Sequence, residues 1–276
     1  MRLDLRNFSA SPDLTFFQQA FNLRLENTVW LVLDVGNSEV KGGLYDDGLL
    51  HHTFRATHET ASLVATLRGE IRGHHIERAG FSSVVPRSTD TIERALSEAG
   101  VGTTRIVHGM RLPFELAYET PETLGADRLA AAAAAWLLFG RAMERGVIAI
   151  DAGTALTYDV VDRAGIYRGG AIAPGPALMQ RSLHHETAQL PEVKLSLPAD
   201  PIGRSTVESI RVGVMYGFID GVRGLLHRIN DSLGCETFIV VTGGWGSMLQ
   251  DHVPEVDVVE PHLVLEGIRM LMEANG

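Results

Sequence analysis

The stretch LVLDVGNSEVKGGLYDDG, residues 31–48, places a carboxylate where an apolar strand is expected to end. The apolar run stops at Asp34, a turn containing Gly36 comes next, and a second strand-like run leads to another turn at Gly48. A charge at a buried strand end is unfavourable unless a cation or a substrate meets it there. The remainder of the chain therefore has to show what this carboxylate meets.

The same pattern occurs a second time, with Asp151 lying 117 positions after Asp34. The second copy is IAIDAGTALTYDVVDRAGIY, residues 148–167. Both copies show an apolar strand, Asp-x-Gly, a second apolar strand, a polar turn ending in Gly48 or Gly165, and the start of a third strand. A single Asp-x-Gly arises easily by chance, but the complete frame does not. We therefore predict two related α/β halves, each opening with a hairpin whose turn faces a shared cleft.

Strands alternate with helices from residue 29 onward, which is typical of an α/β protein. Helices are predicted at 59–74, 89–99, 126–145 and 262–274, with strands at 79–85 and 104–108. Alanine has the highest helix propensity, and we expect the run AAAAAA to form a closely packed helix face. The domain boundaries are predicted as an N-terminal extension at 1–28, an N-terminal domain at 29–120 and a C-terminal domain at 121–276.

The N-terminal extension differs in pattern from the rest of the chain. Leu14, Phe17, Phe21 and Leu25 would share one face of a short helix. Packing of this helix on the body of the protein and binding of a partner both remain open interpretations.

Composition narrows the class of protein. The 276 residues carry a formal charge of −10 and a sequence pI near 5.5, without a basic tract that would favour nucleic-acid binding. One cysteine, Cys235, excludes an intrachain disulfide and favours a reducing compartment. No apolar run approaches the length of a membrane span or of a signal-peptide core. We therefore expect a cytoplasmic protein that binds neither nucleic acid nor membrane.

A paired Asp-Gly hairpin suits a metal-bound polyphosphate. Glycine lets backbone N–H groups approach an anion closely, whereas a carboxylate beside a phosphate needs a cation between them. Two ordinary hairpins with Asp as a turn residue remain the alternative, which the repetition in register disfavours. Neither G-x-x-x-x-G-K-[ST] nor G-x-G-x-x-G occurs, so a P-loop is excluded and a dinucleotide-binding Rossmann site is disfavoured.

Five segments in order make the chain similar to the type III pantothenate kinases, within the actin, sugar-kinase and heat-shock ATPase superfamily. They are DVGNSEVKGGLY, YETPETLGADR, IDAGTALTYDVV with RGGAIAPG behind it, ETAQLP, and TGG. The match spans roughly residues 29–272, and it departs at Ser38, where the family usually has threonine. The resemblance implies two ribonuclease H-like domains of the actin-like ATPase type with a nucleotide cleft between them. It also implies ATP-dependent phosphorylation of pantothenate to 4'-phosphopantothenate, the first step of coenzyme A biosynthesis.

The resemblance also implies an ATP site with Mg²⁺. Its residues would be Asp34, Val35, Gly36, Asn37, Ser38, Glu39, Val40, Lys41 and Thr154. Asp34 would hold Mg²⁺ directly or through water, since Mg²⁺ keeps several waters and uses few carboxylates. Lys41 lies in the next strand, where contact with a phosphate and exposure to solvent both remain open. Asp151 would bind a monovalent cation, K⁺ or NH₄⁺, that offsets its charge near ATP.

The acceptor side comes from the same resemblance. Asp127 would be the catalytic base, mainly orienting the acceptor hydroxyl, because a loose transition state does not require early proton removal. An acidic residue also suits the start of an alanine-rich helix, and both roles can hold. Arg128 would pair with the pantothenate carboxylate or form a structural ion pair. The substrate-binding residues would be Tyr118, Gly125, Ala126, Asp127, Arg128 and Thr187, the last reaching the site from the partner subunit of a homodimer.

Two other classes of function remain open. A non-catalytic accessory relative that binds nucleotide or a partner is the main alternative, and a superfamily kinase or phosphatase with a different acceptor is another. The histidine pairs at 51–52, 74–75 and 184–185 lack Cys or Glu companions at zinc-like spacing, so solvated or locally bonded side chains are expected there.

Overall fold

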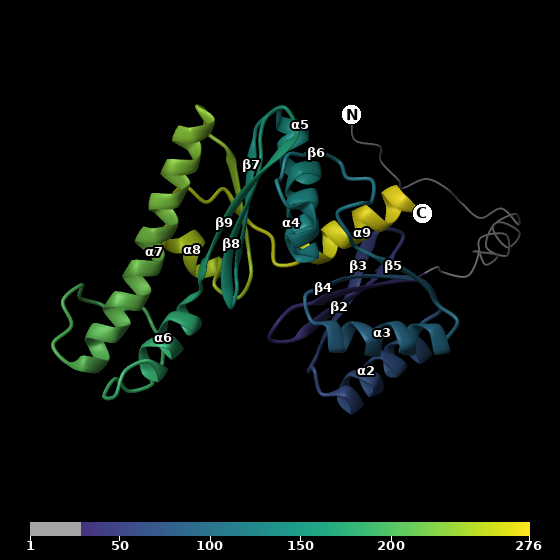
Figure 1. Cartoon of the computed structure of the whole chain (residues 1–276), viewed down its shortest axis with the longest axis horizontal. Helices are drawn as coiled ribbons and strands as arrows, with labels where there is room; N and C mark the ends of the chain where they lie inside the picture. Colours follow the sequence, from purple (N-terminus) through teal and green to yellow (C-terminus); the bar gives the residue numbers. More distant parts are fainter. Residues whose placement is uncertain (1–28) are drawn as a thin grey trace, which may run out of the picture.

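A computed structural model describes residues 29–276 and divides them into two sheets flanked by helices (Figure 1). The predicted helix in the N-terminal extension lies outside the described residues. The strands are β1 (Val29–Val35), β2 (Val40–Asp46), β3 (Leu49–Ala56), β4 (Ile76–Ser83), β5 (Gly102–Arg105), β6 (Glu115–Leu116), β7 (Val147–Ala152), β8 (Ala155–Val161), β9 (Ile166–Pro174), β10 (Phe238–Thr242) and β11 (Val258–Val259). The α-helices are α2 (Thr60–Gly73), α3 (Pro86–Glu98), α4 (Ala126–Ala135), α5 (Arg141–Met143), α6 (Pro176–His185), α7 (Thr206–Leu233), α8 (Gly246–His252) and α9 (Leu263–Asn275).

The two sheets repeat one strand order. The first sheet runs β3-β2-β1-β4-β5, and the second contains β9-β8-β7-β10-β11 in the same succession, with β6 added beside β9. In each half the first two pairings are antiparallel and the next two are parallel. The duplication predicted from sequence is therefore present in the topology.

The strand register shows one difference between the halves. Asp34 lies opposite Lys41 across the first hairpin, whereas Asp151 lies opposite Thr157. The first turn is thus one residue shorter in the second half. The sequence alignment, which kept a constant offset through the hairpin, was therefore displaced by one position along β8.

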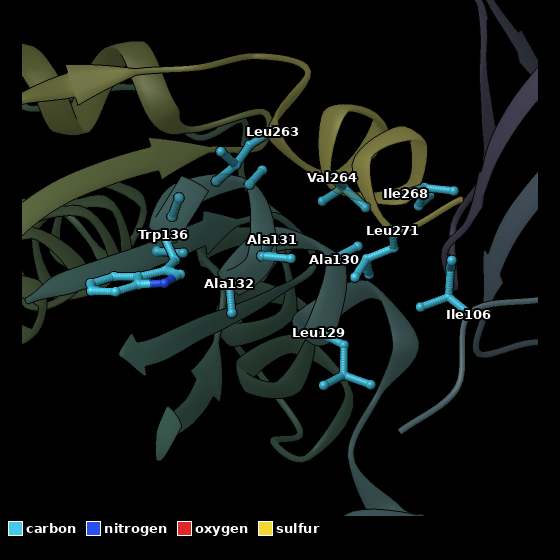
Figure 2. Packing of buried hydrophobic residues seen from close by; sticks show 14 of the residues in the cluster. Ile106, Leu129, Ala130, Ala131, Ala132, Trp136, Leu263, Val264, Ile268 and Leu271 are labelled. Carbon is cyan, nitrogen blue, oxygen red and sulfur yellow. The ribbon is translucent and has the colours of Figure 1, made fainter. Parts of the chain in front are cut away.

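Helices α4 and α9 lie between the two sheets, while α2 and α3 cover the outer face of the first sheet and α7 and α8 that of the second (Figure 1). Every alanine from 130 to 135 is buried. A Cβ at Gly267 of α9 would lie 1.8 Å from the carbonyl oxygen of Ala130, so the two helix backbones touch. Ala130 and Ala131 face Val264 and Leu271 in this contact (Figure 2). Small side chains permit this approach, which confirms the expected packed face.

Several element boundaries differ from prediction: α3 begins at Pro86 and not at 89, β4 runs from Ile76 to Ser83 and not over 79–85, and two further elements differ more. The helix expected at 126–145 is α4, then a π-helical turn at Trp136–Gly140, then α5, ending at Glu144 with positive φ. Such turns occur as local bulges inside helices. The strand expected at 104–108 ends at Arg105, because the pairing of β5 with β4 starts at Gly102 and stops at Arg105. Within residues 29–276, no helix combines the length and apolarity needed to cross a bilayer.

Candidate functional site

A cleft of about 710 Å³ lies between the two halves and is lined by residues from both. Strands β1 and β4 run parallel, as do β7 and β10, and ligands in such sheets bind beyond the carboxyl ends of the strands. Asp34 and Asp151 stand near those ends of β1 and β7, and both line the cleft. The two carboxylates that the sequence singled out thus face one cavity.

Asp34 is buried and receives a hydrogen bond from a neighbouring strand. Ser82 of β4 donates its hydroxyl to Oδ1 of Asp34 at 3.0 Å. Burial raises the pKa of Asp34 to about 7, helped by the charges of Asp127 and Asp151 and opposed by Lys41 and Ser82. A carboxylate in this setting gains from any cation placed beside it. Ser82 was not predicted, since its role depends on the pairing of β1 with β4.

Asp151 occupies the equivalent position with fewer partners. Thr242 of β10 lies beside it as Ser82 lies beside Asp34, but the Thr242 hydroxyl donates to the Pro261 carbonyl at 3.4 Å. Oδ1 of Asp151 is left buried without a hydrogen-bond partner. Burial, with a contribution from Asp127, raises the pKa of Asp151, and Lys41 opposes the shift.

Gly243, with φ of 89°, gives Asp151 room. A Cβ there would lie 2.4 Å from Oδ1 of Asp151 and 2.7 Å from the carbonyl oxygen of Ala152. A carboxylate oxygen and a backbone carbonyl therefore both lie next to a position without a side chain, which is a donor set that suits a hard cation.

Lys41 enters the cleft and is not a solvent-facing strand residue. It lines the cavity opposite Asp34, and its charge lowers the pKa of both Asp34 and Asp151. On the adjacent strand Arg55, opposite Lys41, forms an ion pair with Glu39 at the cleft. Lys41 is consequently placed to meet an anion between the halves.

Asp127 lies in the first turn of α4 and, with Arg128, lines the cleft. Its Oδ1 accepts the backbone N–H of Arg128 at 2.8 Å. Because its charge contributes to the raised pKa of Asp34 and of Asp151, the three carboxylates form one electrostatic cluster. Asp127 is therefore both an acidic residue at the start of a helix and a residue of the cleft wall.

The two Asp-Gly turns touch one another across the cleft. The hydroxyl oxygens of Ser38 and Thr154 lie 2.8 Å apart within hydrogen-bond distance. Ser38 is therefore at the point where the halves meet. The contact is made by the hydroxyl group, which serine and threonine both carry.

Arg128 forms a buried ion pair, which was one of the two interpretations left open. Its Nε donates to Oδ1 of Asp159 at 2.9 Å, and its Nη2 lies 2.8 Å from the same oxygen. Burial lowers the pKa of Arg128, but the charges of Asp159 and Tyr167 and the hydrogen bonds to Asp159 and Tyr118 together outweigh it, so the net direction is upward. Burial raises the pKa of Asp159 to about 6, so the pair is ionised at neutral pH. Asp159 was quoted within the second motif but was not predicted as a site residue.

Comparison with known proteins agrees with these motifs. The family model described as type III pantothenate kinase matches residues 30–228. The protein named "Type III pantothenate kinase" from Brevibacillus brevis is 34% identical over 255 residues, covering 89% of this chain and 98% of that protein. Its namesake from Chlorobaculum tepidum is 36% identical over 259 residues, covering 90% and 94%.

The chain belongs to the type III pantothenate kinase family. Solved structures of lower identity agree on the fold, which is the two-domain actin-like ATPase arrangement predicted from sequence. A putative Baf family transcriptional activator from Campylobacter jejuni has a TM-score of 0.56 at 20% identity, covering 89% of this chain and 98% of that one. Component A of (R)-2-hydroxyglutaryl-CoA dehydratase from Acidaminococcus fermentans has a TM-score of 0.52 at 13% identity, covering 90% and 100%.

The predicted site residues of this type III pantothenate kinase family member fall into two groups. Those that line the cleft are Asp34, Gly36, Asn37, Ser38, Glu39, Lys41, Asp127, Arg128, Asp151 and Thr154. Those outside its lining are Val35, Val40, Tyr118, Gly125, Ala126 and Thr187. The two valines are buried in the core beneath α2 and α3, and the exposed Thr187 donates its hydroxyl to the Leu183 carbonyl at the end of α6. Trp245 and His262 line the cleft and had not been predicted.

Proposed function

We propose that this cleft transfers the γ-phosphoryl group of ATP to the primary hydroxyl of pantothenate. The observation that carries the proposal is the convergence of Asp34, Asp127, Asp151 and Lys41, from four elements, on one cavity. Family membership supports the activity, which is the phosphorylation of pantothenate to 4'-phosphopantothenate in the first step of coenzyme A biosynthesis. Phosphoryl transfer depends mainly on alignment and charge neutralisation, and this cluster supplies both.

The first turn and Lys41 would hold the phosphates of ATP. Gly36, Asn37 and Ser38 offer backbone and side-chain donors at the cleft, and Lys41 supplies the positive charge. Asp34 is the carboxylate for the divalent ion, because its burial and raised pKa favour a neighbouring cation. The magnesium ion, when bound, neutralises charge on the phosphates.

No group of three or more His, Cys, Asp or Glu side chains within residues 29–276 is arranged to hold a metal ion by itself. Mg²⁺ does not require such a group, since one or two carboxylates and the substrate phosphates suffice.

Asp127 would act on the acceptor. Its place at the N-terminus of α4 leaves it beside both other carboxylates and at the wall of the cleft. There it accepts a hydrogen bond from the primary hydroxyl, orients that oxygen, and receives its proton as the phosphoryl group transfers. Gly125 and Ala126 bring the helix N-terminus to the acceptor, and Tyr118 approaches from the segment before it.

Asp151 would bind a monovalent cation, K⁺ or NH₄⁺. The equivalent carboxylate, Asp34, accepts a hydrogen bond from Ser82 and lies opposite Lys41, whereas Asp151 lies opposite Thr157 and keeps Oδ1 without a hydrogen-bond partner. A buried unpartnered carboxylate oxygen is costly, and a cation beside it removes that cost. The same ion would offset the charge of Asp151 near ATP, where Thr154 makes a contact.

A homodimer would complete the site. Exposed apolar side chains occur on β9, on α6, in the segment before α7 and at the start of α7; they are Ile172, Leu178, Leu183, Ile202 and Val207. Where such side chains form one contiguous patch, they mark an interaction surface. A second copy packed there would place its Thr187 at the substrate. We place the enzyme in the cytoplasm, where ATP is available and an exposed free cysteine stays reduced.

The accessory-factor alternative has no observation in its favour. A protein that only binds a partner does not need three carboxylates at one cleft, since each adds to the cost of burying the others.

The decisive experiment measures ADP formation with and without pantothenate, in K⁺ and in Na⁺ buffers. We expect ADP only when pantothenate is present, and an ATP affinity about 5- to 150-fold weaker in Na⁺, the usual range for coupling between two bound ligands. Pantothenate-independent turnover, or none from folded protein, would contradict the kinase proposal. Equal activity in Na⁺ and K⁺ would contradict the cation assignment while leaving the kinase intact.

The shared active site predicts complementation between two defective chains. Thr187→Ala and Asp127→Asn, each impaired alone, should recover activity when co-expressed, because one site of the heterodimer then has both native residues. The heterodimer is purified through two different tags, and its turnover is compared with each homodimer. Activity no higher than that of the Thr187→Ala homodimer, in a verified heterodimer, would show that Thr187 does not act in the partner's site.

A further inference from the structure

We propose that Asp159 is a positioning residue for the acceptor, because it fixes the Arg128 guanidinium with one edge turned toward the acceptor carboxylate. The inference rests on the proposed function, since it assumes that pantothenate lies beside Arg128. It adds a residue that does not itself line the cleft.

The contacts of Arg128 use only part of its guanidinium. Nε and Nη2 both lie within 3 Å of Oδ1 of Asp159, and Nη2 also donates to the Tyr158 carbonyl at 3.3 Å. None of these bonds uses Nη1. Arg128 also lines the cleft. Nη1 is therefore the nitrogen that these bonds leave for a carboxylate in the cleft. Tyr118 lies within hydrogen-bond reach of the same guanidinium.

Asp159 is itself held in place. The hydroxyl of Tyr167 donates to Oδ1 of Asp159 at 2.7 Å, and both side chains are fully buried. The ring of Tyr167 packs edge-on against Tyr118, with 5.9 Å between centroids. One hydrogen-bonded and packed group thus joins Asp159, Arg128 and Tyr118, and a network of this kind sets orientation more firmly than a single contact.

Two glycines of the RGG segment shape the space around this group. A Cβ at Gly170 would lie 1.6 Å from the Tyr158 carbonyl oxygen and 3.3 Å from Nη2 of Arg128. A Cβ at Gly169, whose φ is 97°, would lie 3.4 Å from the Tyr118 ring. The backbone of β9 therefore forms a close-fitting wall for both side chains, which restricts the guanidinium to one orientation.

A buried arginine without its carboxylate partner carries an uncompensated charge and is free to turn. Asp159→Asn keeps the shape of the side chain and an oxygen for Arg128 and Tyr167, but removes the charge. We therefore expect the Michaelis constant for pantothenate to rise about 10- to 100-fold, the range found when a charged supporting residue is altered. The Michaelis constant for ATP should change little, since the proposed phosphate site is formed mainly by the first Asp-Gly turn and Lys41.

The experiment uses pantothenate and its uncharged analogue, in which a primary alcohol replaces the carboxylate. Steady-state constants for both acceptors are measured for the wild type, Asp159→Asn, Arg128→Lys and the double variant. Asp159→Asn should raise the Michaelis constant for pantothenate and leave that for the alcohol nearly unchanged. In the Arg128→Lys background it should add little, because its effect passes through Arg128.

Asp162→Asn is the matched control. It alters another Asp–Arg pair in the same β8–β9 hairpin, the half-buried Asp162 with the exposed Arg168, and this pair is outside the cleft lining. Its kinetic constants should equal those of the wild type. If Asp159→Asn fails to fold, Tyr167→Phe loosens Asp159 while keeping the ring, and should shift the pantothenate constant in the same direction by a smaller factor.

Equal effects on pantothenate and on the alcohol, or additive effects in the double variant, would overturn the positioning role. A wild-type enzyme that phosphorylates neither acceptor would instead overturn the proposed function.

Discussion

Asp127→Asn is expected to lower kcat about 100- to 10 000-fold, which is the usual contribution of a positioned acid–base group. Asparagine preserves the shape of the side chain and can still accept the Arg128 backbone N–H, so the start of α4 should be retained. It cannot take the hydroxyl proton of the acceptor. It also removes one negative charge from a cluster in which each carboxylate disfavours the others. Affinity for ATP should therefore stay the same or increase while turnover falls.

A fall in kcat without a loss of ATP affinity is the result that tests Asp127 as the base. ADP formation gives kcat, and calorimetric titration of the magnesium–ATP complex gives the dissociation constant. Asp90→Asn, the same chemical change on the exposed outer helix α3, serves as the control and should match the wild type. A fall in kcat of less than about tenfold, with ATP binding intact, would show that Asp127 is not the base.

The sequence predicted the parts of the fold that repeat. The strand–turn–strand frame around Asp34 and around Asp151 depends on local rules, namely apolar strands, glycine turns and the spacing between them. Those rules were enough to place both carboxylates on one cleft, and the shared strand order of the two sheets confirms the duplication. The alanine run was likewise predictable, because small side chains permit close helix contact.

The partners of the site residues could not be predicted in the same way. Ser82 bonds Asp34 from 48 positions away, and Asp159 holds Arg128 from 31 positions away, through strand pairings that periodicity does not specify. The turn after Asp151 is one residue shorter than its counterpart, so alignment alone misplaced the residues of β8. A polar residue inside an otherwise apolar strand, as Asp159 is in TYDVV, was the available signal for a buried partner.

Asp34→Asn should have opposite effects on activity and on stability. Loss of the carboxylate that we propose for the magnesium ion should reduce kcat/KM about 100- to 1000-fold, as expected for removal of one group that stabilises transition-state charge. Without metal or nucleotide, however, the same carboxylate destabilises the fold at neutral pH, because burial raises its pKa from 3.8 to about 7. The variant should therefore be less active and, under those conditions, more stable.

The sign comes from proton linkage. Folded protein binds the Asp34 proton more tightly than unfolded protein, so this stabilising contribution is complete below pH 3.8 and is lost as pH rises through 7. Asparagine has no such loss. Unfolding by denaturant, in the presence of a chelator, should show the stability of the variant rising relative to that of the wild type between pH 5 and pH 8, by about 3 kcal/mol. Magnesium and ATP should reverse the order at pH 8, because only the wild type gains their full binding energy. A difference in stability that is the same at both pH values would mean that the Asp34 carboxylate is not destabilised by burial, and its assignment to the cation would lose its physical basis.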